Sequence, residues 1–190
     1  PNGTDQVTLN VVYNRLVGIC KEMGSTMMRA AYSPIFSESL DFSCVVFDRD
    51  GVMLAQSEFS PAQGGAIRFV VKWLIAEIGD DMLKPGDVVI HNDPYRGGSH
   101  LPDITVVTPV FNHDELLFFT ASRAHHSEIG GIAPGSMPPF STTLAEEGVL
   151  IRSFKLLEQG QSHEDRLLQV LSDHPYPSRT PKVNLADIRA

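Results

Sequence analysis

The sequence has few of the features that mark disulfide-rich, membrane or nucleic-acid-binding proteins. Its 190 residues include only two cysteines, Cys20 and Cys44, which cannot form a disulfide framework and which we expect to be buried. No apolar run approaches the roughly 20 residues that a membrane-spanning helix needs. The 15 Lys and Arg residues form no stripe, and the net charge is −8. Nucleic acid and anionic membranes are therefore not expected partners.

Other signals are missing as well. The sequence shows no internal repeat and no nucleotide-binding motif, so any ATP that the reaction consumes must be bound by another polypeptide. It shows no signal peptide at its start, so we expect a reducing cytoplasm. A hydrophobic content of 42% is ordinary for a globular chain.

What the sequence does contain is a concentration of histidines between residues 91 and 131. Five of the seven histidines lie there, among glycines and prolines that favour turns. This is the only stretch where ligand chemistry is favoured over packing. The five are His91, His100, His113, His125 and His126.

The spacing within this stretch predicts a metal site. His100 and Asp103 are three residues apart on a Pro-containing turn, where both side chains can point to one place. Residues 104–111 and 116–122 are strand-like and flank a short polar linker, which predicts a β-hairpin. The hairpin would return His125 and His126 to the turn. Two imidazoles and one carboxylate with open positions suit Mn²⁺, Fe²⁺ or a catalytic Zn²⁺.

An alternative interpretation applies to each histidine alone, because histidines after strands are often surface or hydrogen-bonded core residues. The pattern also does not decide between His125 and His126 as the second imidazole. His-x-x-Asp is a weak signal without its distant partner, and it differs from the His-x-Asp pattern of jelly-roll oxygenases.

Two motifs in this stretch resemble the hydantoinase B/oxoprolinase family. The resemblance extends through the whole chain, with one departure at residues 61–65, where many relatives have a Pro-x-His-x-Gly turn and this chain has Gln63. The motifs are Asn92-Asp93-Pro94-Tyr95-x-Gly97-Gly98-x-His100-Leu101-Pro102-Asp103 and His125-His126-x-x-Ile129-Gly130-Gly131-x-x-Pro134-Gly135-Ser136.

The resemblance implies a B-type subunit of an ATP-dependent cyclic-amide hydrolase that opens hydantoin, 5-oxoproline or a lactam. An A-type partner subunit would use the ATP, so we expect a hetero-oligomer. The implied cofactor is a divalent metal, Mn²⁺ first and Zn²⁺ or Fe²⁺ as alternatives, held by His100, Asp103 and His125.

Other residues have expected roles around the metal. His126 or Glu128 would move the proton, and Glu38 is a further acid/base candidate, although a capping or turn role suits Glu38 as well. Tyr95 and Arg96, in a glycine-hinged loop, are the expected substrate contacts, since Arg can bind a carboxylate or phosphate through two hydrogen bonds.

Two other functions remain open at this point. One is the alpha-type subunit of an ATP-dependent ketone carboxylase, which would use the same ligands. The other is an inert assembly fragment that binds a partner through its helices.

The remaining patterns predict an α+β fold, a mostly antiparallel sheet built from hairpins and covered by two or three helices. Residues 4–32 read as an amphipathic helix whose apolar stripe, including Val7 and Val11, faces the core. A hairpin should follow in residues 37–57, and then a loop at Gly64-Gly65 opening a helix over 66–78 with Trp73 as a core anchor. Further segments are strands at 88–90 and 149–154, a helix at 161–172 and a linker at 175–181.

The chain begins at Pro1, without an initiator Met, and stops where a helix is being entered. We expect residues 1–190 to be an N-terminal fragment of a hydantoinase B-type subunit, forming a single domain around the metal-site segment 91–131.

Overall fold

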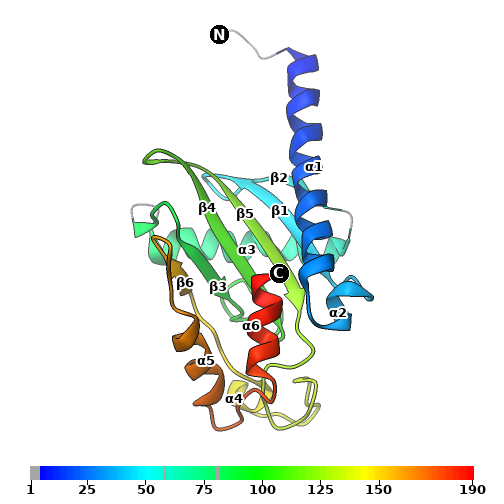
Figure 1. Ribbon diagram of the computed structural model, residues 1–190, viewed down its shortest axis with the longest axis vertical. Coiled ribbons are helices and arrows are strands. Elements are labelled where there is room, and N and C mark those ends of the chain that lie inside the picture. Colours follow the sequence, from blue (N-terminus) through cyan, green and yellow to red (C-terminus); the bar gives the residue numbers. More distant parts are fainter. Residues whose placement is uncertain (1–4, 58, 80–81) are drawn as a thin grey trace.

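The computed structural model describes residues 5–57, 59–79 and 82–190, and it confirms an α+β fold. A seven-stranded sheet has the order β2-β1-β5-β4-β3-β6-β7, and every neighbouring pair is antiparallel (Figure 1). The strands are β1 (Phe42–Asp48), β2 (Met53–Gln56), β3 (Val88–His91), β4 (Asp103–Asn112), β5 (Glu115–His125), β6 (Phe154–Glu158) and β7 (Gln161–Ser162). The helices are α1 (Gln6–Ala30), α2 (Pro34–Ser37), α3 (Pro61–Ile78), α4 (Leu144–Glu147), α5 (Glu164–Ser172) and α6 (Pro181–Arg189).

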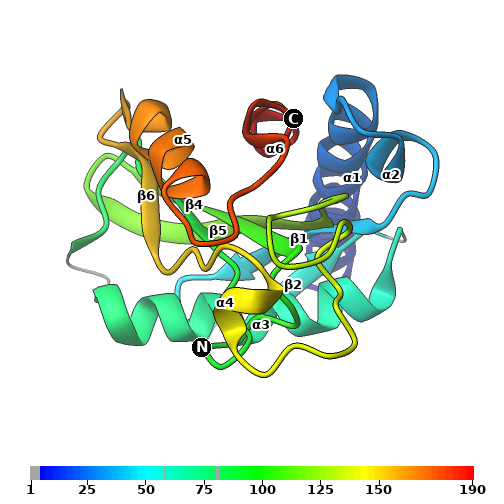
Figure 2. The ribbon, with the colours of Figure 1, turned by 90° about the horizontal axis from the view of Figure 1, so that it is seen from below.

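Helices cover both faces of the sheet. Figure 2 shows α3 beneath it and α1, α5 and α6 above it. Because successive side chains of a strand point to opposite faces, β1 contributes Val45 and Phe47 to the core under α3, and Phe42 and Cys44 to the core under α1 and α2. A strand buried on both faces loses the polar alternation of a surface strand, which explains why residues 44–47 of β1 are all apolar.

The predicted central hairpin is present as β4 and β5. Asp103 pairs with His125, and Thr105 pairs with Arg123. Both pairs lie on the face that carries α3, because they alternate in step with Val107, which belongs to the core under that helix. The hairpin thus brings the turn before β4 and the end of β5 together at one end of these two central strands.

The burial of helix α1 differs in part from the prediction. Its C-terminal half packs on the sheet and buries Cys20 and Met27. Its N-terminal half extends past the edge of the sheet (Figure 1), and Val7 and Val11 are 72% and 57% exposed. The apolar periodicity was right for a helix, but the sheet is too short to cover the whole stripe.

The segment around α3 also differs from the prediction. The helix begins at Pro61, so Gly64 and Gly65 lie inside it rather than in a preceding loop. A Cβ at Gly64 would come within 2.7 Å of the Gln56 Oε1 atom, so the absence of a side chain there lets α3 approach the sheet. Trp73 is only half-buried and is not a core anchor, because its Nε1 donates to Glu77 at 2.7 Å at the surface.

The C-terminal third matches the prediction less closely. Residues 149–153 are not a strand, and β6 begins only at Phe154. The predicted helix at 161–172 is shorter at its start, because residues 161 and 162 form β7. Helix α6 follows the predicted linker.

Candidate metal centre

The site begins with a turn between the loop after β3 and the start of β4. The Asp103 N–H donates to the His100 carbonyl at 3.0 Å, which closes a β-turn with Pro102 at its third position. His100 and Asp103 are therefore the first and last residues of one turn. His125, the last residue of β5, faces Asp103 across the hairpin.

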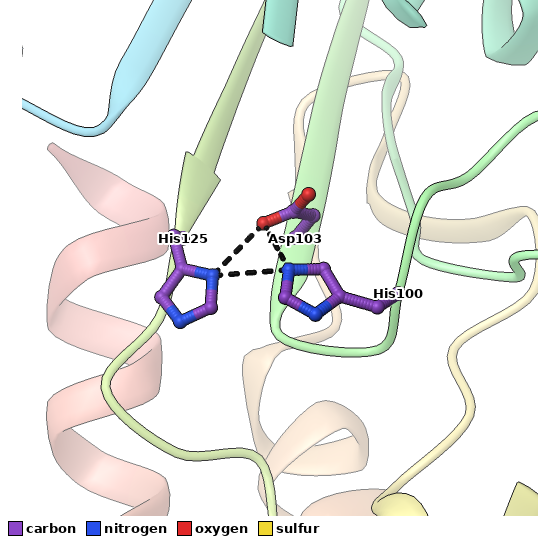
Figure 3. A group of neighbouring side chains, drawn as sticks. All are labelled: His100, Asp103 and His125. Atoms are coloured by element: carbon purple, nitrogen blue, oxygen red, sulfur yellow. Dashed lines mark hydrogen bonds and ion pairs between the residues drawn. The ribbon is translucent and has the colours of Figure 1, made fainter. Parts of the chain in front are cut away.

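The three side chains converge on one point (Figure 3). The His100 Nε2 atom lies 2.9 Å from Asp103 Oδ1, and the His125 Nδ1 atom lies 3.1 Å from the same oxygen. The two ring nitrogens are 3.1 Å apart. Asp103 and His125 are buried, whereas the His100 side chain is 35% exposed, so the triangle opens to solvent on the His100 side.

The donor triangle, as we call these three atoms, fits a divalent metal ion. Ligands bonded at about 2.1 Å and at right angles are about 3.0 Å apart, and tetrahedral ligands are about 3.4 Å apart. The observed edges of 2.9 to 3.1 Å match the right-angle case. Two imidazoles and one carboxylate on one face of an octahedron leave the opposite positions open for other ligands.

The charges of the donor triangle are set by its own contacts. Burial alone would raise the pKa of Asp103, but hydrogen bonds from His100, His125 and Ser99 hold that pKa far below its usual range. The hydrogen bond to Asp103 raises the pKa of His100, against a smaller opposite effect of burial. A proton on His100 and a metal ion would compete for the same nitrogen, so metal binding is expected to weaken at acidic pH.

Sequence reasoning missed Arg123, which lies fully buried behind Asp103. Its Nε donates to Thr105 Oγ1 at 2.8 Å, its Nη1 to Ser99 Oγ at 3.2 Å and its Nη2 to the Gly97 carbonyl at 3.2 Å. Burial lowers the pKa of the guanidinium to about 10, so it stays charged at neutral pH. Strand alternation was the available signal, since Arg123 is two residues before His125 and shares its face.

The structure separates His125 from His126. The strand alternation turns His126 to the opposite face, where its ring contacts Phe36 edge-on at 5.2 Å and its Nδ1 lies 3.5 Å from Asn184 Nδ2. Burial lowers the pKa of His126 to about 4. His125 is therefore the imidazole that shares a point with His100 and Asp103.

Glu128 is placed away from the donor triangle, at the start of α6. Its Oε1 accepts from the N–H groups of Arg179 and Thr180 at 3.0 and 3.1 Å and from the Ser178 hydroxyl, and its Oε2 accepts from the Gly130 N–H at 2.9 Å. Burial raises the pKa of Glu128, but these hydrogen bonds lower it more, so the net pKa is below the ordinary value.

The other predicted residues lie at the surface. Tyr95 is 84% exposed. The Arg96 guanidinium is 2.9 Å from Glu77 and lies over the Trp73 ring, 5.0 Å from its centroid. Glu38 is exposed at the C-terminal end of α2. None of the interactions described for the donor triangle includes these three residues.

The loop that carries His100 is fixed at its base by Asn92. Its side-chain amide donates to the Leu101 and Val149 carbonyls at 2.8 and 3.0 Å, and its Oδ1 accepts from the Ile151 N–H at 2.6 Å. Asp93, which follows it, caps the loop by accepting a hydrogen bond from the Tyr95 N–H at 2.9 Å.

Together, the antiparallel α+β fold and a triangle of two histidines and a carboxylate define a class of protein with a candidate divalent metal centre at the end of a hairpin. Comparison with known proteins gives the family. Residues 5–190 match the Hydantoinase B/oxoprolinase family model, and the chain belongs to that family. Within the described residues, no helix is both long enough and apolar enough to cross a membrane.

Individual relatives agree with this assignment. 5-Oxoprolinase 1 of Arabidopsis thaliana is 43% identical over 197 residues, which cover 100% of this chain and 16% of that protein. The crystal structure of the ATP-dependent caprolactamase from Pseudomonas jessenii is 31% identical with a TM-score of 0.84, over 99% of this chain and 32% of that one. This chain therefore spans a third or less of the length of either.

A nucleotide-free acetone carboxylase structure has the same fold. Its TM-score is 0.83 at 20% identity, over 97% of this chain and 24% of that chain. At this identity the likeness concerns the fold alone.

Proposed function

We propose that this chain is part of a metal-dependent B-type subunit that opens the ring of a cyclic amide. The substrate class is a hydantoin, 5-oxoproline or another lactam. The proposal rests on family membership and on relatives named as a 5-oxoprolinase and a caprolactamase, which are proteins that act on cyclic amides.

The donor triangle is the observation that supports the chemistry most directly. His100, Asp103 and His125 would hold a divalent ion, with Mn²⁺ as the first candidate and Zn²⁺ or Fe²⁺ as alternatives. When bound, such an ion supplies a Lewis acid that polarises a carbonyl oxygen and lowers the pKa of water. The exposed edge of His100 is the side from which a substrate would approach.

The proposal also includes roles for five further residues, whose surroundings in the structure differ. Tyr95 is free to contact a substrate, since its side chain is largely exposed. Arg96 would have to leave Glu77 in order to bind a carboxylate or phosphate. His126 and Glu128, proposed for proton transfer, are buried among partners near α6, and Glu38 would need to approach from α2.

ATP use is assigned to a partner. The chain has no nucleotide-binding motif, and the relative of known structure is named as ATP-dependent. We therefore propose an A-type subunit that binds ATP, in a hetero-oligomer located in the cytoplasm. A ketone carboxylase would use the same donor triangle, but among the described residues no contact favours the carboxylase or the assembly-fragment alternative.

The test is the metal content of the purified protein, prepared without chelator, measured by elemental analysis for the wild type and His100→Ala. Near-stoichiometric Mn, Zn or Fe in the wild type and its loss in the variant are expected. Ring-opening assays with the A-type subunit, ATP and cyclic amides then follow. A wild type that stays metal-free after reconstitution would leave the assembly role as the better explanation.

A further inference from the structure

Arg123 is the buried cation behind the donor triangle. We propose that Arg123 is a positioning residue, which acts through Ser99 to fix Asp103 as a one-oxygen ligand and which also fixes the loop that carries His100. This inference rests on the proposed metal function and deepens it.

The first step of the argument concerns the two oxygens of Asp103. Oδ1 faces both histidines, and Oδ2 accepts a hydrogen bond from the Ser99 hydroxyl. The same hydroxyl accepts from Arg123 Nη1 at 3.2 Å. The relay Arg123–Ser99–Asp103 therefore occupies Oδ2 and leaves Oδ1 as the oxygen available to a metal. Outer partners of this kind orient a ligand and set its affinity for the metal.

The second step concerns His100. Asp103 and His125 belong to strands, whereas His100 lies in the loop that follows β3, so its position depends on how that loop is held. Arg123 Nη2 donates to the Gly97 carbonyl at 3.2 Å, three residues before His100. One guanidinium on β5 is thus joined both to the strand ligand, through Ser99, and to the loop of the third ligand.

The third step weighs this role against a purely structural one. A buried guanidinium is costly to desolvate, and buried charge pairs can often be replaced by apolar residues without loss of stability. Arg123 is 0% exposed, and its hydrogen-bond partners among the described residues are Thr105, Ser99 and Gly97, none of which offers a carboxylate. The nearby negative charge that favours its ionised form is that of Asp103. The position of Arg123 therefore stabilises the charge of the Asp103 carboxylate rather than the packing of the apolar core.

The charge balance of the site follows from the same placement. Asp103 carries one negative charge and Arg123 one positive charge, so the neutral histidines and this pair sum to zero. A divalent ion would then add two positive charges to this group, which the nearby Asp41, whose charge also acts on His100, offsets only in part. The proposed position of Arg123 therefore favours an anionic ligand there, such as a carboxylate or a phosphorylated substrate.

The experiment compares five forms of the purified protein with Mn²⁺ as the probe: wild type, Ser99→Ala, Arg123→Met, Arg123→Lys and one control variant. The dissociation constant is measured by titration, and the electron paramagnetic resonance spectrum of bound Mn²⁺ reports the ligand geometry. Ser99 is exposed as a residue, so Ser99→Ala should fold even if Arg123→Met does not. Lys155→Met is the matched control, because Lys155 pairs at 3.0 Å with Asp87, a buried carboxylate outside both the donor triangle and the loop that carries His100.

We expect Ser99→Ala to raise the dissociation constant by about tenfold or more and to change the spectrum, since outer partners of metal ligands typically contribute 10- to 100-fold in affinity. Arg123→Lys should recover part of the affinity that Arg123→Met loses, and Lys155→Met should leave both readouts unchanged. Unchanged affinity and spectrum in Ser99→Ala overturn the relay while the metal function stands. A wild type that binds no Mn²⁺, Zn²⁺ or Fe²⁺ overturns the metal function and the relay with it.

Discussion

Asp103 and His125 stand opposite each other at the open end of the β4–β5 hairpin, with Oδ1 and Nδ1 3.1 Å apart. The register of one hairpin thus sets the distance between two of the three donors. Strand pairing, which is rigid compared with loops, provides the fixed side of the donor triangle. His100 is the adjustable member, and the turn that ends at Asp103 limits its movement.

The first prediction concerns the charge of that strand ligand. Asp103→Asn keeps the shape of the side chain but removes the negative charge that the two histidines and the Arg123 relay share. Because Asp103 is itself a proposed ligand, affinity for Mn²⁺ should fall by more than the roughly 10- to 100-fold typical of outer partners. Equilibrium dialysis against Mn²⁺ measures the change.

A matched control is Asp87→Asn. Asp87 is also fully buried, and it lies just before β3, where it pairs at 3.0 Å with Lys155 of β6, outside the donor triangle. This variant should lose stability but keep the Mn²⁺ affinity of the wild type. Equal losses of affinity in both variants would mean that Asp103 acts on the metal only by stabilising the fold.

The second prediction tests the loop that carries His100. Gly97 has a φ of +89°, and a Cβ there would lie 2.5 Å from the backbone carbonyl carbon of Phe69 in α3. Gly97→Ala therefore combines an unfavourable backbone conformation with a clash between two backbones. We expect a loss of about 3 kcal/mol or more in the free energy of unfolding, together with weaker metal binding.

Gly160→Ala separates the two effects, because Gly160, in the turn between β6 and β7, has a similar φ of +82° and no described atom within 4 Å of the place of an added Cβ. Its expected cost is only about 1–2 kcal/mol, from the backbone conformation alone. Urea unfolding of both variants gives the comparison. If the two costs are equal, the contact between the loop and α3 is looser than the structure indicates.

Local signals explain which parts of this arrangement could be predicted from the sequence. The hairpin was predictable because β-branched runs flank a short polar linker, and His100 and Asp103 were predictable because a turn holds residues three apart. The choice between His125 and His126 needed the register of β4 against β5, which fixes the face of each side chain. Arg123 was missed because a single basic residue in a strand reads as a surface residue until both faces are known to be covered.

Helix α1 shows a different limit. Apolar periodicity identifies which residues share a helix face, but the length of the packed part depends on where the sheet ends. The prediction for Trp73 was wrong for another reason. Trp73 was expected to be buried because of its size, yet its N–H group donates a hydrogen bond to the surface carboxylate of Glu77. The packed length of α1 depends on contacts between distant segments, which no local pattern encodes, whereas the Trp73–Glu77 hydrogen bond lies within one helix.

The third prediction follows from the uneven burial of α1. Met27 is 8% exposed and packs against Phe36 and Phe42, whereas Val11 is 57% exposed. Met27→Ala should lower the free energy of unfolding by about 2–5 kcal/mol, while Val11→Ala should change it by less than about 0.5 kcal/mol. Urea denaturation of the purified protein measures both. A large loss in Val11→Ala would show that the N-terminal half of α1 is covered in solution.

The fourth prediction concerns the pH dependence that Glu128 gives to the fold. Its carboxylate accepts the N–H groups of Arg179 and Thr180 at the start of α6, and its pKa is lower in the folded protein than the ordinary value of 4.5. A lowered pKa means that the stabilisation is complete above pH 4.5 and is lost as the pH falls through the folded-state pKa. At neutral pH, Glu128→Gln should therefore cost about 1–3 kcal/mol in the free energy of unfolding.

The size of that cost should itself depend on pH, which separates the charge of Glu128 from its packing. As the pH is lowered from about 5 toward about 2, the wild-type carboxylate becomes protonated and the difference from Glu128→Gln should narrow. Urea unfolding across this range measures it, with Glu115→Gln, a change at an exposed residue of the β4–β5 turn, as the control that shows no such trend. A difference that stays constant with pH would assign the effect to side-chain shape. The attachment of α6 to the end of β5 would then depend on packing rather than on the carboxylate charge.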